Sequence, residues 1–156
     1  MDKTNVMRLL DVANMEYKYH LYSSEETDGQ KVAKLVNKNE YEVFKTLVTV
    51  GASNTNYVFV VPVYATLNLK KAAKSVGEKF VEMIKQKDLL PLTGYVHGGC
   101  SPIGMKKQFT TVIDETACLV DTMCVSAGRK GVQIEIEPND LLNYVNGKFV
   151  DIIWKI

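Results

Sequence analysis

The segment from Thr93 to Pro102 places glycine, histidine, cysteine and serine side by side. Glycine allows backbone N–H groups to approach a ligand closely, so the Gly98-Gly99 pair could hold an anion or the oxyanion that develops on an attacked carbonyl. A Gly-Gly pair is equally common in a tight turn that only joins two strands. The pair therefore leaves two interpretations open, a carbonyl-binding loop and a structural turn.

His97 and Cys100 in the same loop could form a catalytic pair, because an imidazole beside a thiol raises its thiolate fraction. The two intervening glycines leave their relative geometry undefined, and no third group is spaced to orient the histidine. We therefore favour a partly buried thiol and a surface histidine over a cysteine nucleophile. The chain's three cysteines and two histidines show no metal-ligand spacing, and we expect neither a metal nor an organic cofactor.

Lys45 interrupts an apolar run from Val43 to Val48. Burying an ammonium group without a partner is costly, so this lysine needs an anionic or carbonyl ligand at a pocket mouth, or a solvent-facing position with its stem on apolar neighbours. Tyr22 and His20 precede an acidic loop and could hydrogen-bond a small polar substrate, although aromatic strand residues more often serve packing.

Two basic pairs, Lys106-Lys107 and Arg129-Lys130, could contact phosphates or could lie in solvated turns. The chain has 19 basic and 18 acidic residues and a net charge of +1, which provides no global field for non-specific binding of nucleic acid. A polynucleotide partner must therefore meet a local patch, and we expect no DNA partner.

The helices that would position these residues are predicted from capping residues and from the spacing of apolar residues. Thr4 and Asn68 each precede apolar residues at helical spacing, and Pro138 suits the first turn of a last helix. A helical turn is expected at 85–90. A short helix is expected after the acidic loop, with the side chains of Val32, Leu35 and Val36 facing inward.

Strands are predicted where β-branched and aromatic residues concentrate. The segments are 16–22, 44–50, 57–63, a short one near 80, 111–114, 122–126 and 132–136. The runs 44–50 and 57–63 flank a turn-rich segment, which predicts a hairpin at the sheet centre. In 132–136, Gln133 and Glu135 alternate with apolar residues as in a half-buried strand. The chain lacks strict βαβ alternation, so the sequence predicts an α/β fold with a mixed, mainly antiparallel β-sheet and packed helices.

Length and composition are those of an ordinary globular domain. A chain of 156 residues can remove about 70% of its unfolded surface from water, so residues 1–156 are expected to form one domain. The odd cysteine count without a disulfide pattern fits a reducing compartment. No signal-like start and no long apolar run are present, so we expect a cytoplasmic location and no membrane partner.

The chain resembles the YbaK/EbsC family in four segments, FKTLV (44–48), LKKAAK (69–74), TGYVHGGCSPIGMKK (93–107) and VSAGRKG (125–131). Members of that family are similar to the editing domain of bacterial prolyl-tRNA synthetases, and the nearest likeness is to free-standing Cys-tRNA(Pro) deacylases. The resemblance implies the fold of that family and an enzyme that removes cysteine from mischarged tRNA(Pro) by cleaving the aminoacyl ester.

The resemblance also implies a pocket in which Lys45 contacts the substrate and a loop with Gly98, Gly99 and Ser101 surrounds the ester carbonyl. The substrate's own thiol would attack its ester, which gains the effective concentration of an intramolecular reaction and needs no protein nucleophile. The further substrate-binding positions matched by the family are His20, Tyr22 and Pro102.

The aminoacylated acceptor end of tRNA is the expected partner. Because the net charge is near zero, we expect weak tRNA binding, helped by Lys106, Lys107 and Arg129, with prolyl-tRNA synthetase as a candidate partner that presents the tRNA. Two departures from the family stand out: Cys100 occupies a position that is commonly aliphatic, and Gln133 one that several members fill with aspartate.

Three rival functions remain open. The first is a deacylase for another small amino acid, alanine or serine. The second is a tRNA-binding or regulatory module without catalysis. The third is a thiol hydrolase that uses Cys100 and His97.

Overall fold

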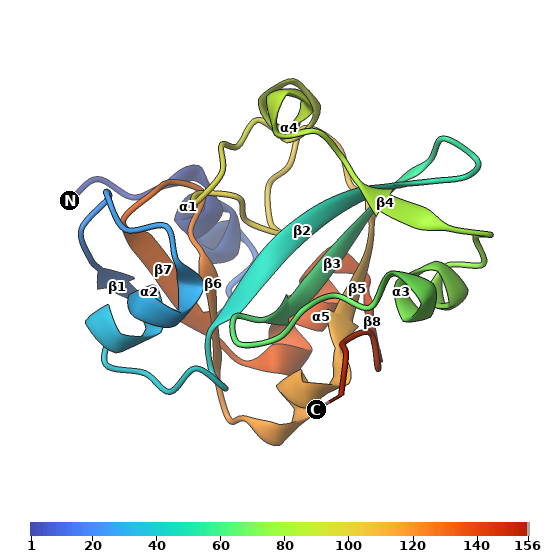
Figure 1. Cartoon of the computed structure of the whole chain (residues 1–156). Coiled ribbons are helices and arrows are strands. Elements are labelled where there is room, and N and C mark those ends of the chain that lie inside the picture. Colours follow the sequence, from blue (N-terminus) through green and yellow to red (C-terminus); the bar gives the residue numbers. More distant parts are fainter. Residues whose placement is uncertain (156) are drawn as a thin grey trace.

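Two β-sheets and five α-helices make up residues 1–155, the part of the chain that this computed structural model describes (Figure 1). The helices are α1 (Asn5–Val12), α2 (Gly29–Leu35), α3 (Leu69–Ser75), α4 (Gln86–Thr93) and α5 (Pro138–Val145), with a 3₁₀ helix η1 at Glu115–Leu119. The strands are β1 (Lys18–Leu21), β2 (Phe44–Gly51), β3 (Asn56–Pro62), β4 (Val81–Met83), β5 (Thr110–Asp114), β6 (Met123–Ser126), β7 (Val132–Ile136) and β8 (Lys148–Val150). Within these residues no helix has the length and apolar character needed to cross a membrane.

The larger sheet has the strand order β4-β2-β3-β5-β8. β2 and β3 form the predicted antiparallel hairpin, with Leu47 opposite Phe59. β5 pairs parallel to β3, and β8 pairs parallel to β5, so the sheet is mixed. β8 was not predicted from the sequence, because its 3 residues are too few to show an alternation.

The smaller sheet has the order β1-β7-β6 and is antiparallel throughout. An isolated bridge between Val43 and Cys124 joins it to the larger sheet, and there the Cys124 amide donates to the Glu42 carbonyl at 2.7 Å. The α/β class with mixed, mainly antiparallel pairing is confirmed. The structure divides the strands between two sheets, a distinction for which strand periodicity carries no signal.

The main hydrophobic core lies between the two sheets. Val48 of β2 and Ile134 of β7 belong to it, and Leu10 of α1 packs into it. The predicted cap of α1 is confirmed, since the Thr4 hydroxyl accepts a hydrogen bond from the Met7 amide at 3.3 Å. This cap satisfies an amide that has no partner within the helix and fixes where α1 begins.

A second core lies on the opposite face of the larger sheet. Phe59 of β3 and Ala72 of α3 belong to it. The predicted cap of α3 is confirmed too: the Asn68 side chain accepts from the amides of Lys70 and Lys71, each at 3.1 Å. This side of the sheet is therefore closed by a helix.

Two expectations about burial are wrong. Leu35 is 54% exposed, because it lies on the outer face of α2, whereas Val32, Ala33 and Val36 face inward. Gln133 and Glu135 are 6% and 7% exposed, so β7 is buried on both faces rather than half-buried. The polar face of β7 contributes directly to the site described next, because Gln133 lines its cavity and Glu135 pairs with Lys38, which follows α2.

Candidate active site

A cavity of about 120 Å³ lies where α2, β2, the loop 97–100 and the smaller sheet meet. Its walls combine apolar side chains with polar ones. The polar and charged side chains are those of Tyr22, Glu26, Thr27, Lys45, Thr46, His97, Ser126 and Gln133. A wider groove of about 690 Å³ runs beside β1, but none of the site residues expected from the sequence lines it.

The cavity exists because one edge of β2 is left open. β3 pairs with β2 along its whole length, whereas β4 pairs only from Thr49 onward. The Val48 carbonyl accepts from the Ile84 amide at 3.2 Å, so the main chain of Val48 faces the β4 side. Since successive residues of a strand direct their N–H and C=O groups to alternate sides, the main chain of Thr46 also faces this open edge.

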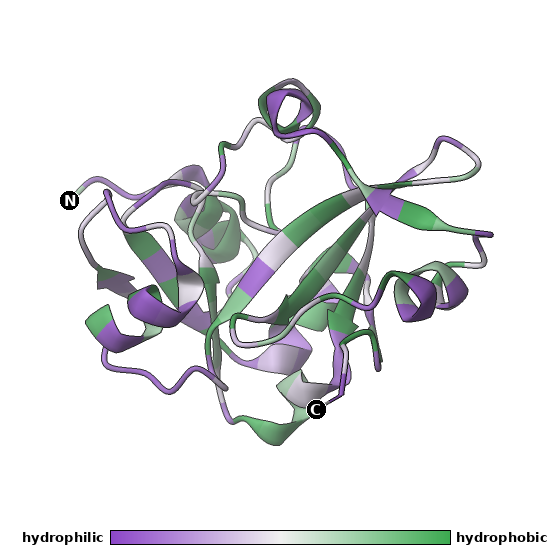
Figure 2. Cartoon of the chain, in the orientation of Figure 1, coloured by the Kyte–Doolittle hydropathy of each residue, from purple (hydrophilic) through white to green (hydrophobic). Residues whose placement is uncertain are grey.

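Lys45 places an ammonium group at this cavity without a protein partner. Within residues 1–155 it makes no hydrogen bond and no ion pair, although its side chain is half-buried. Burial lowers the pKa of Lys45, and the nearby carboxylate of Asp28 opposes that shift only in part. Figure 2 shows the hydrophilic stretch that interrupts the otherwise hydrophobic β2. An unpaired, partly dehydrated cation at a cavity is suited to bind an oxygen-rich ligand.

Two neutral polar groups of the cavity are also unpaired. Thr46 Oγ1 and Gln133 Oε1 are buried, and neither has a hydrogen-bond partner in the described part of the chain. Neither residue was predicted from the sequence to be a site residue, although Gln133 stands where several members of the family have aspartate. The available signal was the alternation of Gln133 with apolar residues in β7, which marked a polar face but not that this face is buried.

The glycine-rich loop borders the cavity through Gly98 and Cys100. Gly98 has a φ of 85°, a conformation that favours glycine, and a side chain on Gly99 would meet the Arg129 backbone at 3.0 Å. The Gly99 amide donates to the Val96 carbonyl at 2.9 Å, whereas the amides of Gly98 and Cys100 have no acceptor within residues 1–155. The pair is therefore a tight turn that also leaves two amides beside the cavity available to a ligand.

Cys100 is a poor candidate nucleophile. Its side chain lines the cavity and is 9% exposed, and burial raises the pKa of its thiol to about 12. His97 lines the same cavity but is exposed and makes no hydrogen bond to Cys100. A thiol that stays protonated at neutral pH acts as a small apolar wall of the cavity.

The other expected loop residues lie outside the lining. Ser101 is fully buried, and its hydroxyl accepts from the Ile103 amide at 3.2 Å, so it shapes the loop. Pro102 is buried beside it. Both residues support the loop from behind rather than facing the cavity.

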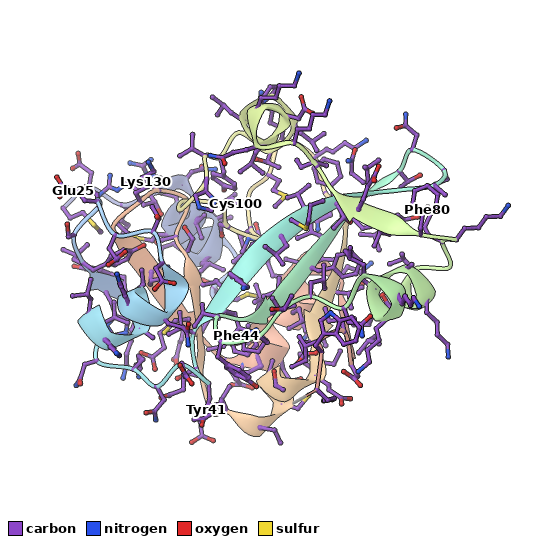
Figure 3. The ribbon with its side chains drawn as sticks, in the orientation of Figure 1. Glu25, Tyr41, Phe44, Phe80, Cys100 and Lys130 are labelled. Carbon is purple, nitrogen blue, oxygen red and sulfur yellow. The ribbon has the colours of Figure 1, made fainter. Side chains whose placement is uncertain are left out.

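The basic residues expected to meet tRNA lie on two surfaces. The Arg129 backbone packs against Gly99 and the Lys130 side chain lies next to Gly98, so this pair lies at the cavity rim. Figure 3 labels Lys130 and Cys100 in this part of the molecule. Lys106 donates to the Pro91 carbonyl at 3.2 Å, and Lys107 lies 5.4 Å from the centroid of the Phe109 ring. These two lysines are exposed and belong to the segment that follows the loop.

His20 belongs to a charged cluster next to the cavity and not to its lining. Its Nε2 lies 2.7 Å from Glu135 Oε1, and Lys38 Nζ donates to Glu135 Oε2 at 3.0 Å. Burial alone would raise the pKa of Glu135, but hydrogen bonds from Thr122, His20 and Lys38 outweigh it and lower that pKa to about 2. The cluster ties the segment after α2 to the polar face of β7.

This cluster also contains three side chains of metal-ligand type. One ligand atom each of His20, Cys124 and Glu135 lie within 4.8 Å of one another. Lys38 already balances the Glu135 carboxylate, and burial raises the pKa of the Cys124 thiol to about 12. Lys38 therefore already neutralises the charge of Glu135, and the Cys124 thiol is protonated, so the cluster offers a metal ion no free anionic ligand.

Comparison with known proteins relates this arrangement to one family. Residues 24–144 match the model of the aminoacyl-tRNA editing domain. The chain is 44% identical over 155 residues to EbsC of Enterococcus faecalis, a candidate Cys-tRNA(Pro)/Cys-tRNA(Cys) deacylase, with 98% of this chain and 94% of that protein covered.

Two solved structures share the fold. A candidate trans-editing enzyme for prolyl-tRNA synthetase superposes with a TM-score of 0.85 at 20% identity, covering 99% of this chain and 100% of that one. A protein described only as hypothetical superposes with a TM-score of 0.89 at 20% identity, covering 97% and 100%. The family match, the 44% identity and the shared fold agree, and the chain belongs to the aminoacyl-tRNA editing domain family.

Proposed function

We propose that the chain is a trans-editing deacylase that removes cysteine from mischarged Cys-tRNA(Pro). The observation that carries the proposal is the unpaired Lys45 ammonium at a small cavity of an editing-domain fold. A cavity of about 120 Å³ suits a small aminoacyl group rather than a large one. The curated relative from Enterococcus faecalis carries the same activity in its name, which supports this substrate.

The chemistry that suits this cavity uses the substrate's own thiol. The cysteinyl thiol gives up its proton as its sulfur attacks the ester carbonyl carbon, a C–S bond forms, and the carbonyl oxygen becomes an oxyanion. The C–O bond to the terminal ribose then breaks, the ribose oxygen takes a proton, and tRNA leaves. A small cyclic thioester remains, and water opens it to free cysteine. Ring closure needs a positioned substrate and not a protein nucleophile, in keeping with the protonated Cys100 thiol.

The protein's part in this reaction is to position the substrate and to stabilise charge. The free amides of Gly98 and Cys100 are the proposed donors to the oxyanion, because both residues line the cavity and neither amide is used elsewhere within residues 1–155. Lys45 is proposed to hold the ester or a neighbouring phosphate. Tyr22 forms part of the wall. Gly99, Ser101 and Pro102 hold the loop that carries the two amides.

The tRNA is proposed to approach over the rim formed by Arg129. The Arg129 backbone itself packs on the glycine-rich loop while the residue is exposed, so its guanidinium is proposed to meet the phosphates of the acceptor end. Lys106 and Lys107 would contact the same strand farther from the cavity. With a net charge of +1, binding would be weak, and prolyl-tRNA synthetase is the proposed partner that presents the tRNA.

Single-turnover release of radiolabelled amino acid from Cys-, Ala- and Ser-tRNA(Pro) tests the proposal. The native chain is expected to release cysteine and to spare serine, whose hydroxyl is a poor nucleophile. Lys45→Ala is expected to slow cysteine release about 100-fold or more, since it removes the only ammonium among the described residues that line the cavity.

Lys79→Ala is the matched control, because Lys79 is exposed and lies outside the cavity lining. Rapid release of alanine as well as cysteine would contradict the thiol-dependent reaction and favour a deacylase for small amino acids. Release of no amino acid would contradict catalysis and favour a tRNA-binding module.

A further inference from the structure

We propose that Gln133, together with Thr46, recognises the polar tip of the aminoacyl side chain and so makes the cavity select a hydrogen-bonding side chain over a methyl group. The proposal rests on the deacylase function and specifies the chemistry that its cavity accepts. The ligand class is a small amino acid whose side chain ends in a thiol or a hydroxyl.

The first support is the state of the Gln133 amide. The residue is 6% exposed, its Oε1 is buried, and it makes no hydrogen bond to any group within residues 1–155. In β7 it lies opposite His20 of β1 and Ser126 of β6, yet His20 binds Glu135 and the Ser126 hydroxyl accepts from the Gly128 amide. Neither neighbour is hydrogen-bonded to the Gln133 amide within residues 1–155, so the amide remains free for a ligand.

The second support is the position of Thr46. Its hydroxyl is also buried and unpaired, and it lines the same cavity from the opposite sheet. A buried amide or hydroxyl without a partner destabilises the fold, and both kinds of group are normally paired in native proteins. Two such groups among the lining residues of one cavity, one from each sheet, indicate a ligand that completes their hydrogen bonds.

The size of the cavity does not separate the small amino acids. A volume of about 120 Å³ with walls that include Val32, Val43 and Val63 excludes large side chains, but alanine fits wherever cysteine and serine fit. Alanine would leave Gln133 Oε1 and Thr46 Oγ1 unpaired. Sites built to hydrogen-bond a side chain discriminate strongly against an analogue that lacks the donor.

The amide recognises the side chain without ionising it. A glutamine side chain is neutral and offers both an acceptor and donors, so it can bind S–H or O–H groups but cannot take their proton at neutral pH. The order in which the three amino acids bind should therefore differ from the order in which they are cleaved. Serine and cysteine should both bind better than alanine, whereas only cysteine carries the nucleophile for ring closure.

The test measures binding with substrate mimics that cannot be cleaved, in which an amide joins cysteine, serine or alanine to the 3′ position of adenosine. For the native chain, the alanine mimic is expected to bind at least about tenfold more weakly than the cysteine and serine mimics. Gln133→Met keeps the side-chain length and removes the amide, and it is expected to reduce that ratio to within about twofold. Gln86→Met, at an exposed position of α4 outside the cavity, should leave the ratio unchanged.

The outcomes distinguish a failure of the proposed role of Gln133 from a failure of the proposed deacylase function. Equal binding of the alanine and cysteine mimics by the native chain would overturn the inference. So would an unchanged ratio in Gln133→Met, even if the native chain cleaves Cys-tRNA(Pro). Failure of the native chain to release cysteine would instead count against the deacylase function. If Gln133→Met does not fold, Thr46→Val decides the matter, because it removes the second polar group with little change in shape and should also lower the ratio.

Discussion

At the scale of single residues, the site is built from groups that weaken the fold. Lys45 keeps a charge where water is partly excluded, and Thr46 and Gln133 keep polar atoms without partners. Each of these groups costs stability in the unliganded protein and becomes favourable only when a ligand supplies its partner. Such a trade between stability and function is expected at an active site and rarely elsewhere.

Lys45→Met should therefore stabilise the protein while abolishing deacylation. Methionine keeps the stem and removes the charge, so the free energy of unfolding at pH 7 should rise by about 1 kcal/mol. Burial lowers the pKa of Lys45, so between that lowered pKa and 10.5 the unfolded chain binds more protons and the native protein gains stability as pH rises. The advantage of the variant should thus shrink toward high pH.

Urea unfolding at pH 7 and pH 10 measures this effect. Lys79→Met provides the control, since Lys79 is exposed and its replacement should change stability little. A variant that loses both stability and activity would show that Lys45 has a structural partner rather than a free ammonium group.

At the scale of elements, the position of α2 determines the shape of the cavity. Gly29 and Val32 of α2 line it, and the chain that leaves the helix is held by the Lys38–Glu135 ion pair to β7. A side chain on Gly29 would meet Val63 at 2.5 Å, so the helix sits as close to β3 as the backbone permits. The ion pair and this close approach together fix this wall of the cavity.

Glu135→Gln should loosen that wall and change how stability depends on pH. In the folded protein the Glu135 pKa is lowered to about 2 from 4.5, so between these values the unfolded chain binds the proton first and stability falls as pH drops. This group contributes at most about 3 kcal/mol above that window. Thermal unfolding from pH 6 to pH 2.5 should show a steeper loss for the native chain than for Glu135→Gln, which should already be less stable at pH 6.

Glu82→Gln serves as the control, because Glu82 is exposed on β4 and has no ion pair within the described chain. Parallel curves for the native chain and Glu135→Gln would contradict the assigned role of the ion pair.

Local signals in the sequence predicted most elements but not their burial. The caps Thr4 and Asn68 and the β2–β3 hairpin were predictable because they depend on a few neighbouring residues. The burial of Gln133 was not, because an alternating strand looks the same whether its polar face meets water or a cavity. Lys45 stood out as a charge in an apolar run, whereas its proximity to the loop at Gly98 depends on the tertiary fold.

At the scale of the whole molecule, charge is balanced overall and uneven locally. The net charge is +1, yet Lys106, Lys107 and Arg129 are exposed cations on the segments that surround or follow the glycine-rich loop. Binding to the acceptor end should then depend on a few phosphate contacts. Such contacts release counterions, so affinity should fall with salt in proportion to their number.

Replacing these three cations one at a time by alanine should lower tRNA affinity similarly for cognate and non-cognate tRNA. Each lost phosphate contact should reduce the slope of log K against log salt by about 0.7 for a single-stranded end. Equilibrium binding of an uncharged tRNA between low and moderate salt measures both quantities, and Lys148→Ala, an exposed lysine on β8, is the matched control. Unchanged slopes in all three variants would show that the acceptor end approaches by another surface, whereas a loss confined to Arg129 would restrict the path of the RNA to the rim of the cavity.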